Sequence, residues 1–230
     1  MKIVKSCYEI LQCPVYEDAL KLVEAATRTC YKSEEKRTEI TAEPLIRKCI
    51  KLGHHTLLEY VNVIVRFICS RGISHELVRH RHISVAQEST RYVSYENKEI
   101  EVIQPYWMSD ETLELLYKGE AYLAKEKEHM QAHCWYTAMT RACDAYLALL
   151  AASLPPQAAR GVLPNDIKTE MVVCVNVREL RHIFNLRSSL ATTGAPHPDM
   201  VRIMDPFLIE MKSRLPVFFE DVSLPKPNLV

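Results

Sequence analysis

The stretch Asn62-Val63-Ile64-Val65-Arg66-Phe67-Ile68-Cys69-Ser70 is rich in valine, isoleucine and phenylalanine. Together with Val61, its apolar residues Val63, Val65 and Phe67 recur at every second position. In an extended segment this spacing places the apolar side chains on one face. The pattern therefore predicts a central β-strand over residues 62–70.

Other segments alternate between strand and helix patterns on both sides of this strand. Without a regular βαβ rhythm, the mixture predicts an α+β fold in one domain over residues 1–215, followed by a loose tail over 216–230. The predicted strands are 3–11, 99–104 and 167–177. The predicted helices are 16–26, 41–52, 75–79 with Ser74 as N-cap, 109–153 with a break at Gly119, 178–191, and 198–215 with a kink at Pro206. Residues 84–94 are expected to form an extended loop.

The composition bounds the class of protein. The chain has 230 residues, 48% of them hydrophobic, which is enough for one well-buried core. Its 29 basic and 29 acidic residues balance. No net field would therefore attract nucleic acid or an anionic membrane, and any basic site must be local.

The N-terminus and the cysteines indicate a reduced protein that is cytoplasmic or otherwise intracellular. The opening sequence reaches Tyr8 and Glu9 before an apolar run of signal-peptide length can form, and no later window resembles a membrane span. The eight cysteines are scattered among hydrophobic residues without a Cys-x-x-Cys pair. This distribution favours reduced core thiols over a disulfide framework.

The densest polar feature is Arg79-His80-Arg81-His82-Ile83-Ser84-Val85-Ala86-Gln87-Glu88-Ser89-Thr90-Arg91. Guanidinium groups match phosphate geometry, and hydroxyls and loop amides can complete an anion site. A helix C-terminus decorated with cations would give the same composition. If residues 79–81 are helical, Arg79 and Arg81 lie about 200° apart and cannot bind one anion. Either the helix has ended by then or the two arginines serve different ligands.

A second polar constellation begins at Asn176. In a following helix, Arg178, Arg181, His182 and Asn185 would share one side. Arg187 would instead fall on the apolar stripe, where a buried guanidinium needs a charged or carbonyl partner unless it reaches solvent at the helix end. The first set is typical of a solvated face, whereas Arg187 favours a functional role.

No pattern supports a metal or a glycine-loop nucleotide site. The chain lacks His-Glu-x-x-His, Cys-x-x-Cys and Asp-x-Asp, and its five glycines are far apart. Weaker candidates for ligand contacts are the histidines of Gly53-His54-His55-Thr56 and the isolated Arg160.

The sequence resembles the flavin-dependent thymidylate synthases. Arg79-His80-Arg81, seven residues and then Ser89 is the signature of that family, and the match continues through Tyr92. Further similarity covers Gly53-His54-His55-Thr56 through Glu59, Ala159 to Pro164, and Val175 to Arg187, so it spans about residues 50–190. The resemblance implies a mixed sheet flanked by helices and a homotetramer with active sites shared between subunits.

The resemblance also implies ligand contacts. FAD would be bound by His54, Thr56, Arg79, His80, Arg81, Gln87, Asn176, Arg178 and His182. The substrate dUMP would be held by Glu76, Arg79, Gln87, Glu88, Ser89, Thr90, Arg91, Arg160 and Arg187. Arg187 and Ser89 would act in catalysis, Arg187 by polarising the uracil and Ser89 by holding or polarising dUMP.

The reaction implied is reductive methylation of dUMP to dTMP. 5,10-Methylenetetrahydrofolate would supply the carbon, and NADPH would supply the reducing hydride through FAD, without a metal, nucleic acid or membrane partner. Two other classes of protein remain without the resemblance. Neutral charge and the lack of lysines near the motif disfavour a nucleic-acid-binding module. The absence of a Gly-x-Ser-x-Gly elbow disfavours a hydrolase that uses Ser89.

Overall fold

Two compact units make up the protein in this computed structural model, which describes residues 1–119, 127–192 and 194–223. Unit 1 comprises Met1–Cys7, Ile68–Leu77 and Gln87–Met171, and unit 2 comprises Tyr8–Phe67, Val78–Ala86 and Val172–Val230. Each unit is therefore assembled from three separate segments of the chain.

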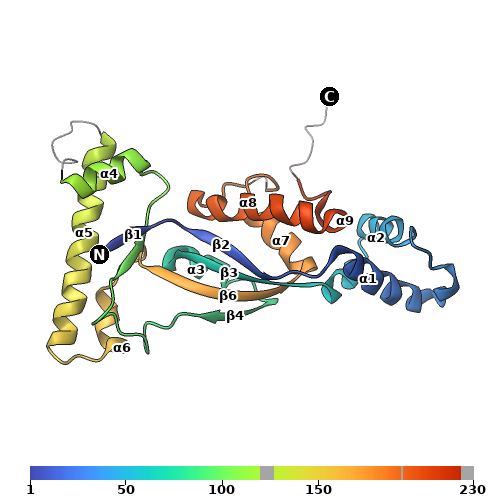
Figure 1. The fold of residues 1–230 in the computed structure, drawn as a ribbon, viewed down its shortest axis with the longest axis horizontal. Helices are drawn as coiled ribbons and strands as arrows, with labels where there is room; N and C mark the ends of the chain where they lie inside the picture. The colour runs from blue at the N-terminus through green and yellow to red at the C-terminus, as the bar shows by residue number, and fades with distance from the viewer. Residues whose placement is uncertain (120–126, 193, 224–230) are drawn as a thin grey trace. The chain divides into compact units, whose positions relative to one another are not determined.

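Strands and helices are mixed along the chain, which confirms the predicted fold class (Figure 1). One sheet has the strand order β2-β3-β6-β4, and β1 pairs in parallel with β5. The strands are β1 (Lys2–Val4), β2 (Cys7–Gln12), β3 (Asn62–Ser70), β4 (Ile83–Gln87), β5 (Glu101–Ile103) and β6 (Lys168–Asn176). The α-helices are α1 (Tyr16–Tyr31), α2 (Ala42–Lys51), α3 (Arg71–Leu77), α4 (Asp110–Lys118), α5 (Lys127–Ala151), α6 (Pro156–Ala159), α7 (Val177–Arg187), α8 (Pro198–Arg214) and α9 (Pro216–Phe219). The 3₁₀ helices, labelled η, are η1 (Glu34–Lys36), η2 (His55–Tyr60) and η3 (Arg160–Val162).

Strand β3 has the predicted bounds and the predicted alternation. Val63, Val65 and Phe67 are buried, whereas the residues between them are more exposed. It lies between β2 and β6 in the sheet, as expected for a central strand. Strand β6 repeats the alternation, with Val173 and Val175 buried.

An aromatic core holds helix α8 within unit 2. The ring of Phe207 on α8 lies 5.0 Å from Tyr8, 5.8 Å from Phe67 and 5.3 Å from Phe184, measured between centroids. Tilted and edge-on aromatic pairs at these distances stabilise a core beyond their buried area. The helix continues through Pro206.

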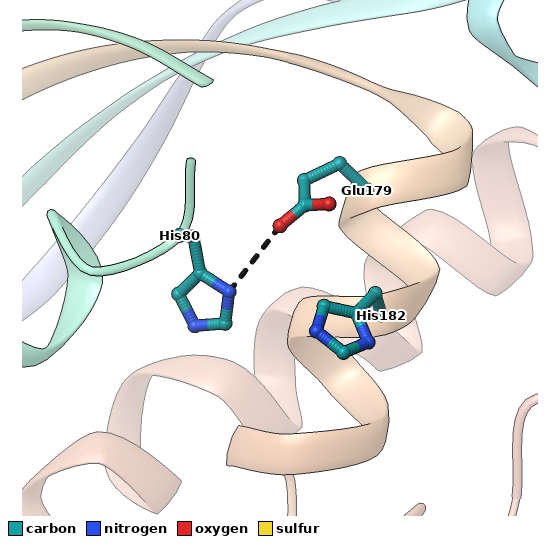
Figure 2. A group of neighbouring side chains, drawn as sticks. All are labelled: His80, Glu179 and His182. Carbon is teal, nitrogen blue, oxygen red and sulfur yellow. Dashed lines mark ion pairs between the residues drawn. The ribbon is translucent and has the colours of Figure 1, made fainter. Parts of the chain in front are cut away.

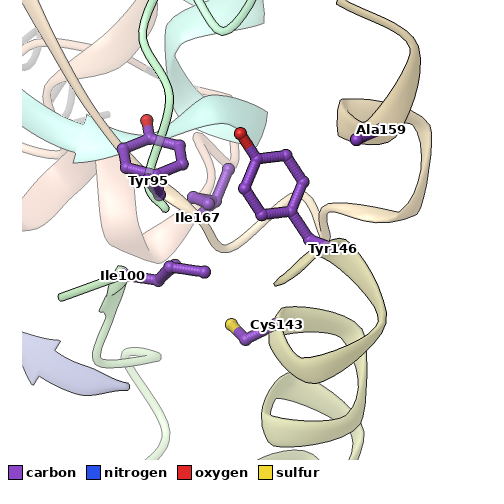
Figure 3. Close-up of a cluster of buried hydrophobic side chains, with 6 residues drawn as sticks. All are labelled: Tyr95, Ile100, Cys143, Tyr146, Ala159 and Ile167. Carbon is purple, nitrogen blue, oxygen red and sulfur yellow. The ribbon is translucent and has the colours of Figure 1, made fainter. Parts of the chain in front are cut away.

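Unit 1 has its own hydrophobic cluster (Figure 3). Cys143 and Tyr146 of α5 pack with Tyr95, Ile100 and Ile167. The preceding helix α4 begins at the predicted Ser109 N-cap, whose hydroxyl accepts a hydrogen bond from the amide of Thr112. It ends at Gly119, which adopts a left-handed conformation with φ of 70° and confirms the predicted break.

Several predicted boundaries are wrong. The predicted N-terminal strand is divided into β1 and β2. The first residues of the loop predicted over 84–94 belong instead to strand β4, and α7 ends at Arg187 rather than at 191. The tail predicted from Pro216 begins with α9, because Val217, Phe218 and Phe219 are apolar enough to be buried; residues 224–230 lie outside the described part.

Ser74 is not an N-cap. It lies buried inside α3, where its hydroxyl donates a hydrogen bond to the carbonyl oxygen of Arg71.

Two further expectations concern the cysteines and the membrane. All eight cysteines are in described residues and none forms a disulfide. The prediction of core thiols holds only for Cys49, Cys69 and Cys143, which are buried; the other five are exposed or half-buried. Of the helices that the structure describes, none has the length and apolar character needed to cross a membrane.

Candidate functional site

Helix α7 presents its polar face to a pocket within unit 2. Asn176 ends β6 and caps α7, because its side-chain oxygen accepts a hydrogen bond from the amide of Glu179 at 2.9 Å. The residues predicted to share one side of the helix all line this pocket, whose volume is about 560 Å³. Its lining consists of His55, Leu58, Glu59, His82, Asn176, Arg178, Glu179, Arg181, His182 and Asn185.

Two arginines of this pocket are held by acidic partners. Arg178 pairs with Glu59 at 2.6 Å. Arg181 makes two hydrogen bonds of 2.7 Å to Asp221 and also donates to the carbonyl oxygen of Phe218. Burial would raise the pKa of Asp221, but the hydrogen bonds and charge of Arg181 outweigh burial and lower this pKa. Arg181 is thus fixed by α9 and the segment after it, whereas Arg178 is more exposed.

The Arg79-His80-Arg81 segment is not helical. Helix α3 ends at Leu77, so the helical angle between Arg79 and Arg81 does not apply, and the first of the two predicted explanations is correct. Arg79 and Arg81 are exposed, whereas His80 between them is buried. The motif therefore projects cations outward and one imidazole inward.

His80 meets α7 in a cluster of ionisable groups (Figure 2). Its Nδ1 lies 3.3 Å from an oxygen of Glu179, and its ring centroid is 5.9 Å from that of His182. Burial and then the charge of Arg187 lower the pKa of His80, which outweighs the opposite effect of Glu179. His80 is consequently neutral at pH 7.

Arg187 lies half-buried at the C-terminal end of α7, after the buried Ile183 and Phe184. The sequence predicted that a guanidinium at this place needs a partner. Its Nε donates a hydrogen bond of 3.5 Å to Nε2 of His80, so one of its partners is an imidazole, a kind of partner that the sequence did not predict. The positive charge is also favoured at a helix C-terminus.

In unit 1, Gln87 at the end of β4 is held by two buried hydroxyls. Its side-chain amide donates hydrogen bonds to Oγ of Ser74 at 2.9 Å and to Oγ1 of Thr169 at 3.2 Å. Two bonds to buried partners restrict the Gln87 side chain before any ligand binds.

The residues that follow Gln87 are also fixed by hydrogen bonds. One carboxylate oxygen of Glu88 accepts a hydrogen bond of 2.9 Å from Tyr95, while Oε2 is buried without a hydrogen-bond partner among the described residues. The Ser89 hydroxyl accepts from the amide of Arg91, and Arg160 donates to the buried Thr90 at 3.3 Å. A buried acceptor without a partner is costly unless a ligand or water donates to it.

The remaining predicted site residues are dispersed. His54 and Thr56 are exposed near the start of η2, although neither lines the pocket of α7, and Glu76 is half-buried on α3. The structure brings together three of the residues predicted for FAD, since Asn176, Arg178 and His182 share one pocket. Within unit 1 it joins Thr90 to Arg160, both predicted for dUMP.

Several residues of these networks were missed from the sequence. Glu179, Ser74 and Thr169 make contacts to predicted site residues, yet none of them belongs to the Arg79–Arg91 motif. Glu179 offered one signal, because a carboxylate three residues before His182 lies on the same side of a helix. Thr169 offered none, because it occurs within an ordinary strand pattern.

Comparison with known proteins identifies the family. The family described as "thymidylate synthase complementing protein" matches residues 13–217. A flavin-dependent thymidylate synthase of Corynebacterium aurimucosum is 33% identical over 88% of this chain and 80% of its own length. One from a Mycobacterium species (strain JLS) is 33% identical over 90% and 82%, respectively.

A solved structure shares the fold of this chain. The UMP/dUMP methylase PolB of Streptomyces cacaoi, solved with 5-Br dUMP, superposes with a TM-score of 0.75 at 19% identity, covering 96% of each chain. The extent of the sequence matches shows that the chain belongs to the flavin-dependent thymidylate synthases, a family of enzymes.

Proposed function

We propose that this chain catalyses the reductive methylation of dUMP to dTMP, with 5,10-methylenetetrahydrofolate as carbon donor and NADPH as reductant through FAD. The observation that carries the proposal is the face of α7, where Asn176, Arg178 and His182 line one pocket. These are residues to which the family resemblance assigns FAD. We further propose that the protein acts in the cytoplasm as a homotetramer.

The pocket of α7 fits a flavin nucleotide in size and chemistry. Its volume of about 560 Å³ lies within the usual range for cofactor sites. Arg178 and His182 offer donors suited to a pyrophosphate, and Leu58 offers an apolar surface. Bound FAD supplies hydride transfer. The chain itself supplies the cations and hydrogen bonds that orient the cofactor.

The Gln87–Arg91 segment fits a nucleotide substrate. The buried Oε2 of Glu88 can accept a hydrogen bond from a sugar hydroxyl, which would satisfy its missing partner. The exposed guanidinium groups of Arg91 and Arg160 suit the phosphate of dUMP. Ser89, whose hydroxyl already accepts a bond from the Arg91 amide, can donate its proton to dUMP.

Arg187 is proposed to polarise the uracil. A guanidinium beside N3 and O2 of the pyrimidine stabilises negative charge on the ring and raises electron density at C5, the carbon that is methylated. Burial strengthens this effect, because a half-buried charge is less screened by water than an exposed one.

Association into a homotetramer would give the exposed arginines of the signature a role. Arg79 and Arg81 project outward in the single chain, as expected if they reach ligands at a site shared between subunits. Sedimentation equilibrium tests this part of the proposal, with four chains per particle as the expected result. A monomer that retains full activity would refute it.

The absorption spectrum of the purified protein tests the whole function. We expect a yellow protein whose flavin bands bleach when NADPH is added without oxygen, and dTMP formation when dUMP and the folate are supplied. A protein that neither retains nor rebinds flavin would refute the proposal.

A further inference from the structure

His80 lies between a carboxylate and a guanidinium of α7 within unit 2. Its Nδ1 is 3.3 Å from Oε1 of Glu179, and its Nε2 is 3.5 Å from Nε of Arg187. His80 and Glu179 are only 7% and 8% exposed, so water competes little for these contacts. Figure 2 shows the His80 ring turned toward Glu179.

The contacts require one tautomer of His80. Since Nε of Arg187 is always a donor, Nε2 of His80 must accept and therefore carries no proton. The proton of the neutral ring is then on Nδ1, where it can be donated to the Glu179 carboxylate. The three side chains form a continuous series in which each donor faces an acceptor.

Helix α7 places the charges of this series at favourable positions. Glu179 is in the first turn and Arg187 in the last turn of the helix. A carboxylate near the N-terminus and a cation near the C-terminus both interact favourably with the helix dipole. The helix dipole thus stabilises the charges of Glu179 and Arg187 independently of His80. The imidazole is therefore available to link the carboxylate to the guanidinium and to orient the latter.

A metal site is the competing explanation for the same side chains. Ligand atoms of His80, Glu179 and His182 all lie within 4.8 Å of one another, and two imidazoles with a carboxylate are a common metal-binding set. However, the guanidinium of Arg187 beside His80 would repel a second cation. The hydrogen-bonded arrangement needs no ion and satisfies both nitrogens of His80.

We propose that Glu179 and His80 are positioning residues for Arg187: Glu179 fixes the His80 tautomer and ring, and His80 orients the guanidinium toward the uracil of dUMP. This inference rests on the proposed function, because it assigns dUMP to Arg187. It also gives His80 a role other than the flavin contact that the family resemblance implies. Both contacts are long for hydrogen bonds, so the expected effects are moderate.

The test is a double-mutant cycle read out as dUMP affinity of the flavin-loaded full-length protein. His80→Phe removes both ring nitrogens and Arg187→Ala removes the guanidinium. We expect His80→Phe to weaken dUMP binding by about three- to tenfold in the native background, but by less than about twofold when Arg187 is already alanine. The FAD affinity of Arg187→Ala should remain within about twofold of the native value.

A second series tests Glu179 and guards against misfolding. Glu179→Gln keeps an acceptor for the His80 proton and should retain most of the dUMP affinity, whereas Glu179→Leu should match His80→Phe. Glu9→Gln is the matched control, because it alters an exposed carboxylate that pairs with Arg66; it should leave dUMP affinity unchanged. Thermal unfolding of each variant identifies any that fail to fold.

The possible outcomes separate the two proposals. Non-additive effects with Glu179→Gln rescue support the positioning role. Additive effects of His80→Phe and Arg187→Ala, in a protein that binds dUMP, overturn the positioning role alone. An unaltered protein that binds no dUMP overturns both proposals. One-to-one binding of Zn²⁺ that both His80→Phe and Glu179→Leu abolish overturns the positioning role in favour of a metal site.

Discussion

Units 1 and 2 prepare their polar side chains in different ways. In unit 1, uncharged hydroxyls and an amide bind one another: Gln87 is held by Ser74 and Thr169. In unit 2, charged groups gather around α7, where Arg178 pairs with Glu59 and Arg181 with Asp221. The first arrangement fixes geometry at low electrostatic cost, whereas the second supplies charge.

This difference indicates which ligand group each unit suits. A network of neutral hydrogen bonds discriminates between donors and acceptors on a sugar or base, because a mismatch leaves a buried group unsatisfied. Clustered guanidiniums bind phosphate oxygens with less demand on position. We therefore expect mutations in unit 1 to affect dUMP and those on the face of α7 to affect FAD, with Arg187 as an exception.

The largest expected effect is that of Arg187→Ala. Removing the cation beside the pyrimidine should lower dTMP formation by at least about 100-fold. Flavin content, measured from the absorption spectrum, should be largely retained. Arg66→Ala is a matched control, since Arg66 forms an exposed ion pair with Glu9 and should keep normal activity. Normal turnover by Arg187→Ala would refute its assigned role.

A crossed pair of variants tests the division between the units directly. Arg178→Ala should weaken FAD binding by about 10- to 100-fold and change dUMP affinity little, because a lost charge-assisted hydrogen bond is worth roughly 1.5–3 kcal/mol. Arg160→Ala should do the reverse. Titration of each variant with FAD and dUMP checks both halves, and each variant serves as the control for the other. Equal loss of both ligands in both variants would remove the proposed division.

The fold could be predicted where a single periodicity dominates the sequence. The residues of β3 alternate without interruption, and its predicted bounds are confirmed. Boundaries failed where tertiary contacts override local signals. Ser74 is a residue type that favours the N-cap position, but it lies inside α3. Its hydroxyl donates a hydrogen bond to the carbonyl oxygen of Arg71 and accepts one from the side chain of Gln87. The apolar residues of α9 were predicted to belong to a loose, proline-containing tail. The surface that buries them is formed by tertiary contacts, which cannot be inferred from the local sequence.

The candidate site was predictable in its residue types but not in its partners. Helical spacing placed Arg178, Arg181 and His182 on one side, and the structure places them in one pocket. The helical spacing also predicted that Arg187 needs a partner, but it did not identify His80. The two residues in this contact are 107 positions apart. No periodicity connects such distant positions, so pairing of this kind needs the fold.

A smaller effect is expected from reversing hydrogen-bond polarity in unit 1. Gln87→Glu replaces a donor by an acceptor facing Ser74, whose single proton is already donated to Arg71. The Thr169 hydroxyl can turn to donate, but the Ser74 contact becomes repulsive. The free energy of unfolding, measured with urea, should fall by about 1–3 kcal/mol. Gln157→Glu, on the exposed surface of the same unit, should change it by less than about 0.5 kcal/mol.

The smallest expected effect is a pH dependence specific to unit 2. Burial and Arg187 lower the pKa of His80 in the folded protein, against the opposing effect of Glu179. The unfolded chain therefore binds a proton at His80 at a higher pH than the folded protein does. The stability from neutral His80 is fully present above the unfolded pKa of about 6.5 and is lost as the pH falls through the lower folded pKa.

Urea unfolding at pH 7.5, 6.5 and 5.5 measures this loss. Carboxylates elsewhere also titrate as the pH falls, so the informative quantity is the difference between the native protein and His80→Phe, which has no imidazole at this position. We expect the native protein to lose stability more steeply below pH 6.5 than the variant does. Because a protonated His80 cannot accept from Arg187, dUMP affinity should fall more steeply over the same pH range in the native protein than in His80→Phe; protonation of the dUMP phosphate weakens binding to both proteins alike. Parallel pH profiles of unfolding free energy for the two proteins would show either that His80 remains neutral or that its protonation costs no stability. In either case unit 2 would have no pH dependence of its own that arises from His80.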